Sequence, residues 1–228
     1  MIDLHSHVLP KMDDGSKSLQ ETMQMLRSSA QQGVKLMAAT PHFYADREDP
    51  ERFLRRRSQS FVQLEQEELP VELLLGAEVA YFPGMGRCEA LQQLCIGQSK
   101  LILVEMPFSN WTDRMIDEVL QLQAGFGLTP VLAHVERYYD AASLLKYKDL
   151  LLGEEVLFQS NAESFLPFFG GKRMMTMLKK QQIHFLGTDC HGVTKRPPNM
   201  GEAVKKIQKS LGSHTLQTLN EFALAILK

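Results

Sequence analysis

Short apolar runs alternate with amphipathic stretches along the chain, and this alternation is its clearest structural pattern. Seven runs are mostly apolar, have the length of strands, and are bounded by glycine, proline or a polar residue. They cover residues 2–4, 35–40, 72–77, 101–104, 130–133, 156–159 and 184–187. Runs of this kind are typical of buried parallel strands. Because most of the intervening stretches have helical periodicity, the sequence predicts a parallel α/β fold.

The intervening stretches carry apolar residues every three or four positions, as helices with one buried face do. In the first of them, Ser18 and Glu21 have the spacing of a capping box, and Gly33 marks the end of the helix. A second helix covers residues 115–126 and ends at Gly127. Further helices are predicted over residues 50–67, 140–151, 172–182, 200–211 and 215–227. Residues 79–97 form the least regular repeat.

Side chains of the types that commonly bind metal ions follow these predicted strands. They are His5, His7, Asp13 or Asp14, His42, Glu78, Glu105, His134, Asp189 and His191. In a parallel barrel the carboxyl ends of the strands meet on one face, where active sites are built. We therefore expect these residues to lie close together although they are scattered in the sequence.

The number of candidate ligands indicates more than one metal ion. Five imidazoles and four carboxylates exceed the roughly four ligands of a single zinc ion, so two or three ions are expected. Mixed imidazole and carboxylate ligands favour Mn²⁺, Fe²⁺ or Zn²⁺. Ions about 3.5–4 Å apart generate hydroxide from water at neutral pH and hold the oxygens of an in-line displacement. This pattern predicts hydrolysis, and the excess positive charge of three ions favours phosphate esters.

Composition and charge narrow the possible functions and cellular locations of the protein. The chain has 228 residues, 44% hydrophobic and 23% charged, which suits one or two ordinary domains. Its 25 basic and 27 acidic residues argue against a nucleic-acid-binding face made by bulk charge. There is no apolar run of about 18 residues for a membrane span, no signal-peptide pattern, and no disulfide framework among three cysteines. We expect a cytoplasmic protein that binds no nucleic acid and inserts into no membrane.

Several motifs resemble those of a known family. They are His5-Ser6-His7, Asp13-Asp14-Gly15, Thr40-Pro41-His42, Gly76-Ala77-Glu78, Val104-Glu105, His134-Val135-Glu136-Arg137, Asn161-Ala162, and Thr188-Asp189-Cys190-His191 with Arg196-Pro197. In this order and over essentially the whole chain, they resemble the bacterial tyrosine-protein phosphatases of the CpsB/CapC/YwqE type. These belong to the PHP (polymerase and histidinol phosphatase) superfamily.

The resemblance implies a distorted seven-stranded (β/α) barrel of the PHP type, TIM-like in plan, with residues 1–228 as one phosphatase domain. It implies a cluster of usually three ions, with Mn²⁺ favoured, and it selects Asp14 rather than Asp13 as the ligand. It also implies phosphotyrosine hydrolysis on the tail of a tyrosine autokinase that controls capsule or exopolysaccharide export. Val135 and Gly192 depart from the family pattern at the edge of the pocket, which bears on substrate preference.

Two arginines complete the predicted site. The resemblance places Arg137 and Arg196 near the phosphate, and both follow ligands on the active face. A guanidinium presents a planar fork of donors that can hold two phosphoryl oxygens. The alternative for Arg137 is an ordinary ion pair with Glu136 or Asp140.

Other interpretations remain open. Cys190 and Arg196 have the Cys-x5-Arg spacing of cysteine-dependent phosphatases, but Pro197 and Pro198 remove amide donors from that loop. The ligands could instead hold a structural metal in a regulatory protein, or serve histidinol-phosphate hydrolysis or an exonuclease. Outside the cluster, two histidines and the basic run from Arg52 to Arg57 are interpreted as structural or solvent-exposed.

Overall fold

Strands and helices alternate along most of the chain in the computed structural model, which describes residues 1–139, 142–166 and 170–227. The strands there are β1 (Ile2–Ser6), β2 (Leu36–Ala39), β3 (His42–Phe43), β4 (Glu72–Leu75), β5 (Glu78–Ala80), β6 (Leu101–Glu105), β7 (Thr129–Leu132), β8 (Leu157–Asn161) and β9 (Phe185–Gly187). The α-helices are α1 (Leu19–Gln31), α2 (Pro50–Val62), α3 (Asp113–Phe126), α4 (Val135–Tyr138), α5 (Ala142–Gly153), α6 (Gly170–Lys179), α7 (Met200–Leu211) and α8 (Ser213–Leu227). Three 3-10 helices are η1 (Met85–Arg87), η2 (Glu89–Leu94) and η3 (Ala162–Phe165).

All pairings between these strands are parallel, as predicted. One sheet has the order β1-β2-β4 and the other the order β3-β5-β6-β7-β8-β9. The two sheets continue into each other, because Ala39 pairs with Leu75 and His42 pairs with Glu78 in the same register. Pro41 lacks the amide hydrogen that a continuous ladder would use. The described residues therefore contain nine strands rather than the predicted seven.

The first and last strands meet and join the two edges of the curled sheet. The amide of Asp189, just after β9, donates to the carbonyl of His5 at 2.8 Å, and the amide of His7 donates to the carbonyl of Cys190 at 3.0 Å. Ser6 and Cys190 form a parallel bridge. The predicted distorted parallel α/β barrel is confirmed in its architecture, and its closure lies at the carboxyl end of β1.

Asp3 reinforces this closure from a fully buried position. Its carboxylate accepts hydrogen bonds from the backbone amide and the hydroxyl of Thr188 at 2.8 and 2.6 Å. Between Asp3 and Ser6 the register of β1 against β2 shifts by one residue. Such a bulge re-aims the side chains that follow it, and His5 and His7 lie in and directly after this part of β1.

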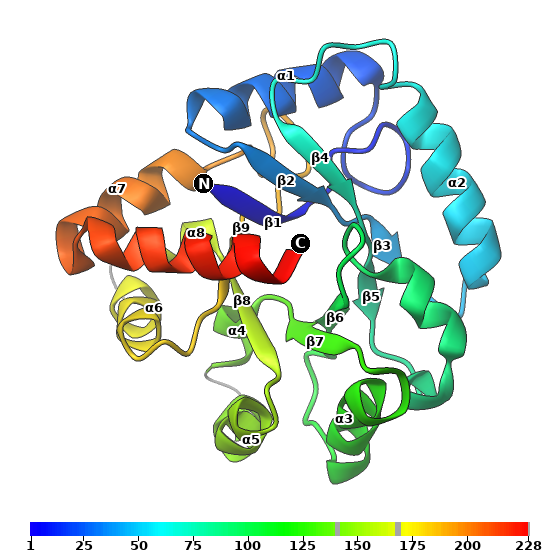
Figure 1. The fold of residues 1–228 in the computed structure, drawn as a ribbon, viewed down its shortest axis with the longest axis vertical. Helices are drawn as coiled ribbons and strands as arrows, with labels where there is room; N and C mark the ends of the chain where they lie inside the picture. The colour runs from blue at the N-terminus through cyan, green and yellow to red at the C-terminus, as the bar shows by residue number, and fades with distance from the viewer. Residues whose placement is uncertain (140–141, 167–169, 228) are drawn as a thin grey trace.

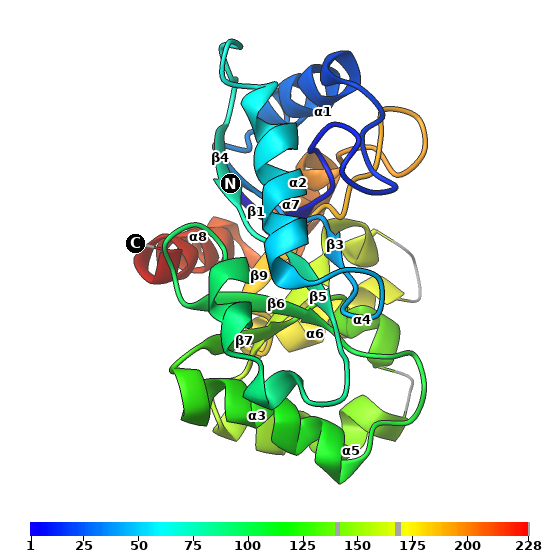
Figure 2. The ribbon, with the colours of Figure 1, turned by 90° about the vertical axis from the view of Figure 1, so that its right-hand side faces the viewer.

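The apolar core has two layers, one inside the curled sheet and one between the sheet and its helices. The inner layer is formed by alternate strand residues, including Ile2, Leu4, Leu36, Ala38, Leu101, Leu103, Val131, Ala133, Leu157 and Phe185. Ala223 and Leu227 of α8 join this inner layer. Figure 1 shows α8 crossing the strands, and Figure 2 shows it at the end opposite the loops that follow β1 and β9. One end of the barrel is thus filled by apolar side chains, which leaves polar residues to the other.

Each predicted helix is present, but several begin or end at other residues than predicted. The helix predicted over residues 50–67 ends at Val62, and the one predicted over residues 172–182 spans Gly170–Lys179. The predicted start at residue 140 lies outside the described residues. The short helix α4 and the strand β5 were not expected. None of the helices formed by the described residues is long and apolar enough to cross a membrane.

The predicted capping box at α1 is half correct. The hydroxyl of Ser18 accepts a hydrogen bond from the amide of Glu21 at 3.2 Å, as expected for an N-cap. The carboxylate of Glu21, however, accepts from the amide of Lys17 at 2.8 Å rather than from that of Ser18. Gly33 adopts a left-handed conformation just after the helix, in agreement with the predicted stop.

We predict that Gly187→Ala destabilises the barrel at its closure. A Cβ atom at Gly187 would lie 2.5 Å from Cβ of His5 and 2.8 Å from Nε2 of Gln159, so β9 would have to move away from β1. Overpacking of this kind lowers the free energy of unfolding by about 1–3 kcal/mol. The matched control is Gly153→Ala at the end of α5, where a Cβ meets no atom within 4 Å. Urea unfolding of the metal-free wild type and of both variants measures their free energies of unfolding. A Gly187→Ala variant that unfolds at the same urea concentration as the wild type would contradict the close approach of β9 to β1.

Candidate metal centre

The strand ends bring all nine predicted ligands into one cluster. Their ligand atoms form four overlapping groups, each with its atoms within 4.8 Å of one another. The groups are His7 with Asp14, His42 and His191; His5 with His134 and Asp189; His5 with His7 and Glu78; and His42 with Glu78 and Glu105. Six of the nine side chains are less than one-tenth exposed, and those of His42 and Glu105 are about one-sixth exposed. Asp14 is largely exposed at the rim. Their binding of metal stays a prediction.

Four of the five imidazoles are held by an oxygen acceptor at Nδ1. His5 contacts Oε1 of Gln159 at 3.2 Å, His7 contacts Oδ2 of Asp13 at 2.6 Å, His134 contacts Oδ1 of Asn161 at 3.0 Å, and His191 contacts the carbonyl of Asp189 at 2.9 Å. An imidazole whose Nδ1 donates its proton keeps a lone pair on Nε2. The Nε2 lone pairs of His5, His7 and His134 therefore point into the cluster, whereas Nε2 of His191 accepts a hydrogen bond from Nη1 of Arg196 at 3.0 Å.

Two side-chain amides on β8 fix this choice of tautomer. Gln159 donates its amide hydrogen to Oδ1 of Asn161 at 3.0 Å, and Asn161 donates in turn to Oδ2 of Asp189 at 3.0 Å. The amide oxygens of both residues are thereby turned toward His5 and His134 as acceptors. Partners of this kind orient metal-binding imidazoles and raise their basicity.

Glu78 lies at the centre of the cluster and is fully buried. One of its oxygens lies 2.7 Å from Nε2 of His134, and the other lies 3.2 Å from Nε2 of His5 and 2.8 Å from Nδ1 of His42. The contact with His42 does not have the geometry of a hydrogen bond, so both of its atoms lack a hydrogen-bond partner among the described residues. Orphaned polar atoms this deeply buried are unusual in native proteins.

The cluster therefore consists of acceptors facing acceptors, which is the arrangement that divalent cations satisfy. Nε2 of His5 and Nε2 of His7 lie 3.2 Å apart, and carboxylate oxygens of Glu78 and Asp189 face both. Lone pairs so close repel one another unless a positive charge lies between them. Neutral imidazoles and carboxylates are the ligands of Mn²⁺, Fe²⁺ and Zn²⁺. The residues present thus fit a multi-metal site.

The pKa shifts of residues in the cluster also favour the binding of cations. Burial disfavours the charged form of Glu78, but His5 and His134 outweigh burial and hold the pKa of its carboxyl well below the usual value. Burial also disfavours charge on His7, yet Asp13 and the nearby carboxylates raise the pKa of its imidazole well above the usual value. Both directions indicate that the carboxylates of the cluster keep their negative charge, which attracts cations.

The two predicted arginines converge on one carboxylate. Nη2 of Arg137 donates to Oδ2 of Asp189 at 2.7 Å, and Nη2 of Arg196 donates to the same oxygen. Arg137 also lies 3.8 Å from Glu105. Its side chain is 31% exposed and that of Arg196 is 43% exposed, so each guanidinium keeps an open side. Glu136, the first partner considered for Arg137 from the sequence, instead accepts hydrogen bonds from the hydroxyl of Ser160 and the amide of Asn161, and residue 140 lies outside the described residues.

Three residues of the site also have strained backbone conformations. His134, Asp189 and Arg196 have φ angles of 54°, 51° and 51°, in the left-handed region that residues other than glycine rarely adopt. Conformations of this kind cost on the order of 1–3 kcal/mol each and persist where the surroundings enforce them. Their occurrence at the ends of β7 and β9 indicates that the site positions these side chains at the expense of local stability.

The residues that orient the candidate ligands were not predicted in that role from the sequence. Asp13 was weighed against Asp14 as a ligand, and the structure gives them different neighbours. Asp14 lies 3.5 Å from His42 and 3.4 Å from His191, whereas Asp13 orients His7 and accepts from the amide of His42 at 3.0 Å. Gln159 and Asn161 were also missed, because each is a polar residue within or beside an apolar run; their only sequence signal was the Asn161-Ala162 motif.

Cys190 does not have the environment of a nucleophile. Its side chain is fully buried, its carbonyl is paired with β1, and burial together with Asp3 raises the pKa of its thiol to about 12. A nucleophilic cysteine instead has a lowered pKa and a position that substrate can reach. This geometry argues against the cysteine-dependent alternative.

A family profile described as capsular polysaccharide synthesis, CpsB/CapC, matches residues 1–225. The chain belongs to the CpsB/CapC family. Among curated relatives, the tyrosine-protein phosphatase YwqE of Bacillus subtilis is 29% identical over 237 residues, which cover 100% of this chain and 92% of YwqE. The tyrosine-protein phosphatase CpsB of Streptococcus agalactiae serotype III is 30% identical over 244 residues, which cover 100% of this chain and 98% of that protein. The resemblance inferred from the motifs is confirmed.

Solved structures extend the comparison of this CpsB/CapC chain to three dimensions. One described as YwqE from Bacillus subtilis and CpsB from Streptococcus pneumoniae, unique metal-dependent tyrosine phosphatases, matches with a TM-score of 0.86 at 27% identity. It covers 100% of this chain and 94% of that one. A histidinol phosphate phosphatase from Lactococcus lactis matches with a TM-score of 0.55 at 13% identity and covers 97% and 93% of the two chains. This second likeness concerns the fold alone.

We predict that Cys190 of this CpsB/CapC chain resists alkylation in the folded protein. Iodoacetamide reacts with thiolates, and Cys190 is buried with a raised pKa, whereas Cys88 is partly exposed. Mass spectrometry after brief labelling at pH 8 is expected to find Cys88 modified and Cys190 unmodified. Labelling in urea, which exposes all three thiols, is the control. Rapid native labelling of Cys190 would revive the cysteine-dependent alternative.

Proposed function

We propose that this chain is a metal-dependent protein-tyrosine phosphatase. In this proposal, three divalent ions are bound by His5, His7, Asp14, His42, Glu78, Glu105, His134, Asp189 and His191. Mn²⁺ is the favoured ion, and Fe²⁺ or Zn²⁺ would suit the same mixture of ligands. The observation that carries the proposal is the cluster of inward-facing lone pairs around Glu78, which requires cations and is larger than one ion can fill.

The metal ions would supply a nucleophile at neutral pH and offset charge on the phosphate oxygens. The remaining work falls to the chain itself. Gln159, Asn161 and Asp13 hold the imidazoles in the tautomer that presents Nε2 to the site. The open sides of Arg137 and Arg196 would grip phosphoryl oxygens, where charge must be stabilised as the P–O bond breaks. Asp189, bound by both guanidiniums, keeps the two arginines beside the cluster.

The proposed substrate is the phosphotyrosine-containing tail of a bacterial tyrosine autokinase in capsule or exopolysaccharide synthesis. The names of the curated relatives and the description of the family support this choice. A cytoplasmic location belongs to the same proposal and is consistent with three free cysteines. The assignment of residues 1–228 to one phosphatase domain is also part of the proposal. It is supported by a single outer apolar core that contains residues from Val8 to Leu219.

The proposed function predicts that activity depends on bound metal. Chelation is expected to abolish hydrolysis of p-nitrophenyl phosphate and of a phosphotyrosine peptide, and Mn²⁺ is expected to restore both. His5→Ala, Glu105→Ala and Asp189→Ala should each lower bound metal as well as turnover, because each side chain belongs to a ligand group. Cys190→Ser is the control and should retain most of both. Activity that survives complete removal of metal, verified by elemental analysis, would refute the mechanism.

The proposed function also predicts that activity depends on Arg137 and Arg196. Arg137→Ala and Arg196→Ala are each expected to lower kcat/KM by at least about tenfold, equivalent to roughly 1.4 kcal/mol, with bound metal retained. Lysine should rescue only part of the loss, because it keeps the charge and lacks the fork. Arg114→Ala is the control, since Arg114 is 76% exposed and pairs with Glu118 in α3. Wild-type kinetics in both alanine variants would contradict the assignment.

A further inference from the structure

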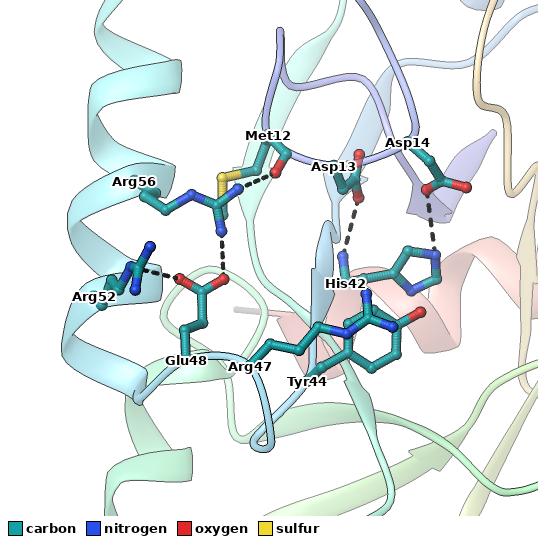
Figure 3. Close-up of a pocket in the computed structure, with 9 residues that line it drawn as sticks. All are labelled: Met12, Asp13, Asp14, His42, Tyr44, Arg47, Glu48, Arg52 and Arg56. Carbon is teal, nitrogen blue, oxygen red and sulfur yellow. Dashed lines mark hydrogen bonds and ion pairs between the residues drawn. The ribbon is translucent and has the colours of Figure 1, made fainter.

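A cavity of about 500 Å³ adjoins the metal cluster on the side of α2. Asp14 and His42 of the cluster lie on one side of the cavity, Arg52 and Arg56 lie across from them, and Arg47 lies against Tyr44 next to His42 (Figure 3). We call this cavity the arginine pocket. Its arginines come from α2 and from the loop that precedes it, and they are separate from Arg137 and Arg196, which contact Asp189.

Three arginines and three carboxylates line the arginine pocket, but the carboxylates leave two of the guanidiniums largely unpaired. Asp13 and Asp14 contact the imidazoles of His7, His42 and His191 on the side of the cluster. Glu48 is bound by Arg56, which also donates to the carbonyl of Met12. Arg52 lies no nearer than 4.0 Å to Glu48 and is 65% exposed. Among the described residues, Arg47 has no carboxylate within ion-pair distance; its guanidinium instead lies 4.1 Å from the centre of the Tyr44 ring. Two guanidiniums are therefore left to bind an anion.

The sequence suggested that the basic run on α2 is one solvated helix face. The structure shows that only part of the run fits this description. Arg55 fits that description, because it is 64% exposed and pairs with Glu51 one turn away. Arg56 ties α2 to the loop that carries Asp13 and Asp14, and Arg57 donates to the carbonyl of Gly76 at 2.8 Å. Arg52 alone among the four is exposed, weakly paired and turned toward the cavity beside the cluster.

We propose that the arginine pocket binds acidic side chains next to the phosphotyrosine of a protein substrate, through Arg47 and Arg52. This inference rests on the proposed phosphatase function, since the cluster would hold the phosphate. A compact cavity of this volume is about 10 Å across, the reach of about three residues of extended chain. A carboxylate that close to the phosphotyrosine in sequence would enter the pocket. Guanidinium matches carboxylate with paired hydrogen bonds, and the Tyr44 ring already orders Arg47.

Three peptides that differ only beside the phosphotyrosine test the proposal, with glutamate, glutamine or lysine at the flanking positions. p-Nitrophenyl phosphate, which has no flanks, reports the reaction at the cluster. The wild-type Mn²⁺-loaded protein is expected to prefer the glutamate peptide over the glutamine peptide by about fivefold in kcat/KM at low salt, and less at high salt. Arg52→Ala and the Arg47→Ala/Arg52→Ala double variant should bring this ratio toward one, and Arg52→Glu should favour lysine.

The matched control is Arg55→Ala, on the same helix, with the same exposure and outside the pocket. It should keep the preference for glutamate, and all these variants should hydrolyse p-nitrophenyl phosphate as the wild type does. Equal rates on the glutamate and glutamine peptides in the wild type, or an unchanged preference in the double variant, would overturn the pocket's role. Equal losses on the peptides and on p-nitrophenyl phosphate would do so too. Failure of the wild type to hydrolyse any of these compounds would instead refute the proposed function.

Discussion

Lone pairs that face one another inside the barrel are the constraint on which the rest of this structure depends. Glu78 is buried among imidazoles whose Nε2 atoms also point inward, and two of those atoms are only 3.2 Å apart. Burying such a set costs far more than ordinary hydrogen bonds return, unless cations occupy the space between the acceptors. The amide relay through Gln159 and Asn161 excludes the simplest escape, which would be to turn an imidazole so that it donates instead. Polar residues behind the ligands therefore determine the charge of the site as firmly as the ligands do.

The fold accommodates this demand by separating the two ends of the barrel. At one end, alternate strand residues and α8 form an apolar inner layer, which supplies the hydrophobic stabilisation. At the other end, a bulge in β1, the break at Pro41 and the left-handed backbone of His134 and Asp189 turn side chains into the cluster. Each of these departures weakens a regular ladder. Gly187 lies between the apolar end and the polar end of the barrel. There β9 must approach β1 closely, so that the barrel can close beside the cluster.

The sequence predicted well which polar side chains the structure brings together, because each stands where an apolar run stops, and the carboxyl ends of parallel strands converge. Their supports were harder to predict. Asn161 extends a strand whose apolar run ends at residue 159, and Asp3 looked like an interruption in an apolar run, so neither differed from an ordinary polar residue. The shortened α2 was missed because Leu64, which is buried, continues the apolar spacing beyond the last helical turn. Partners of this kind depend on which strand lies opposite, and a pattern along one chain does not encode that.

Net charge was also a poor guide to where anions would bind. The formal balance of −2 describes a molecule in which arginines lie on both sides of a centre rich in carboxylates. On one side two guanidiniums meet the carboxylate of Asp189. On the other side Arg56 and Arg52 pair with Glu48, and Arg47 lies against the Tyr44 ring. An anionic substrate would be attracted to these arginines and repelled by the carboxylates of an unfilled centre. The arrangement therefore favours an order of events in which the cluster takes up its cations before the flanking arginines can hold a phosphate against it.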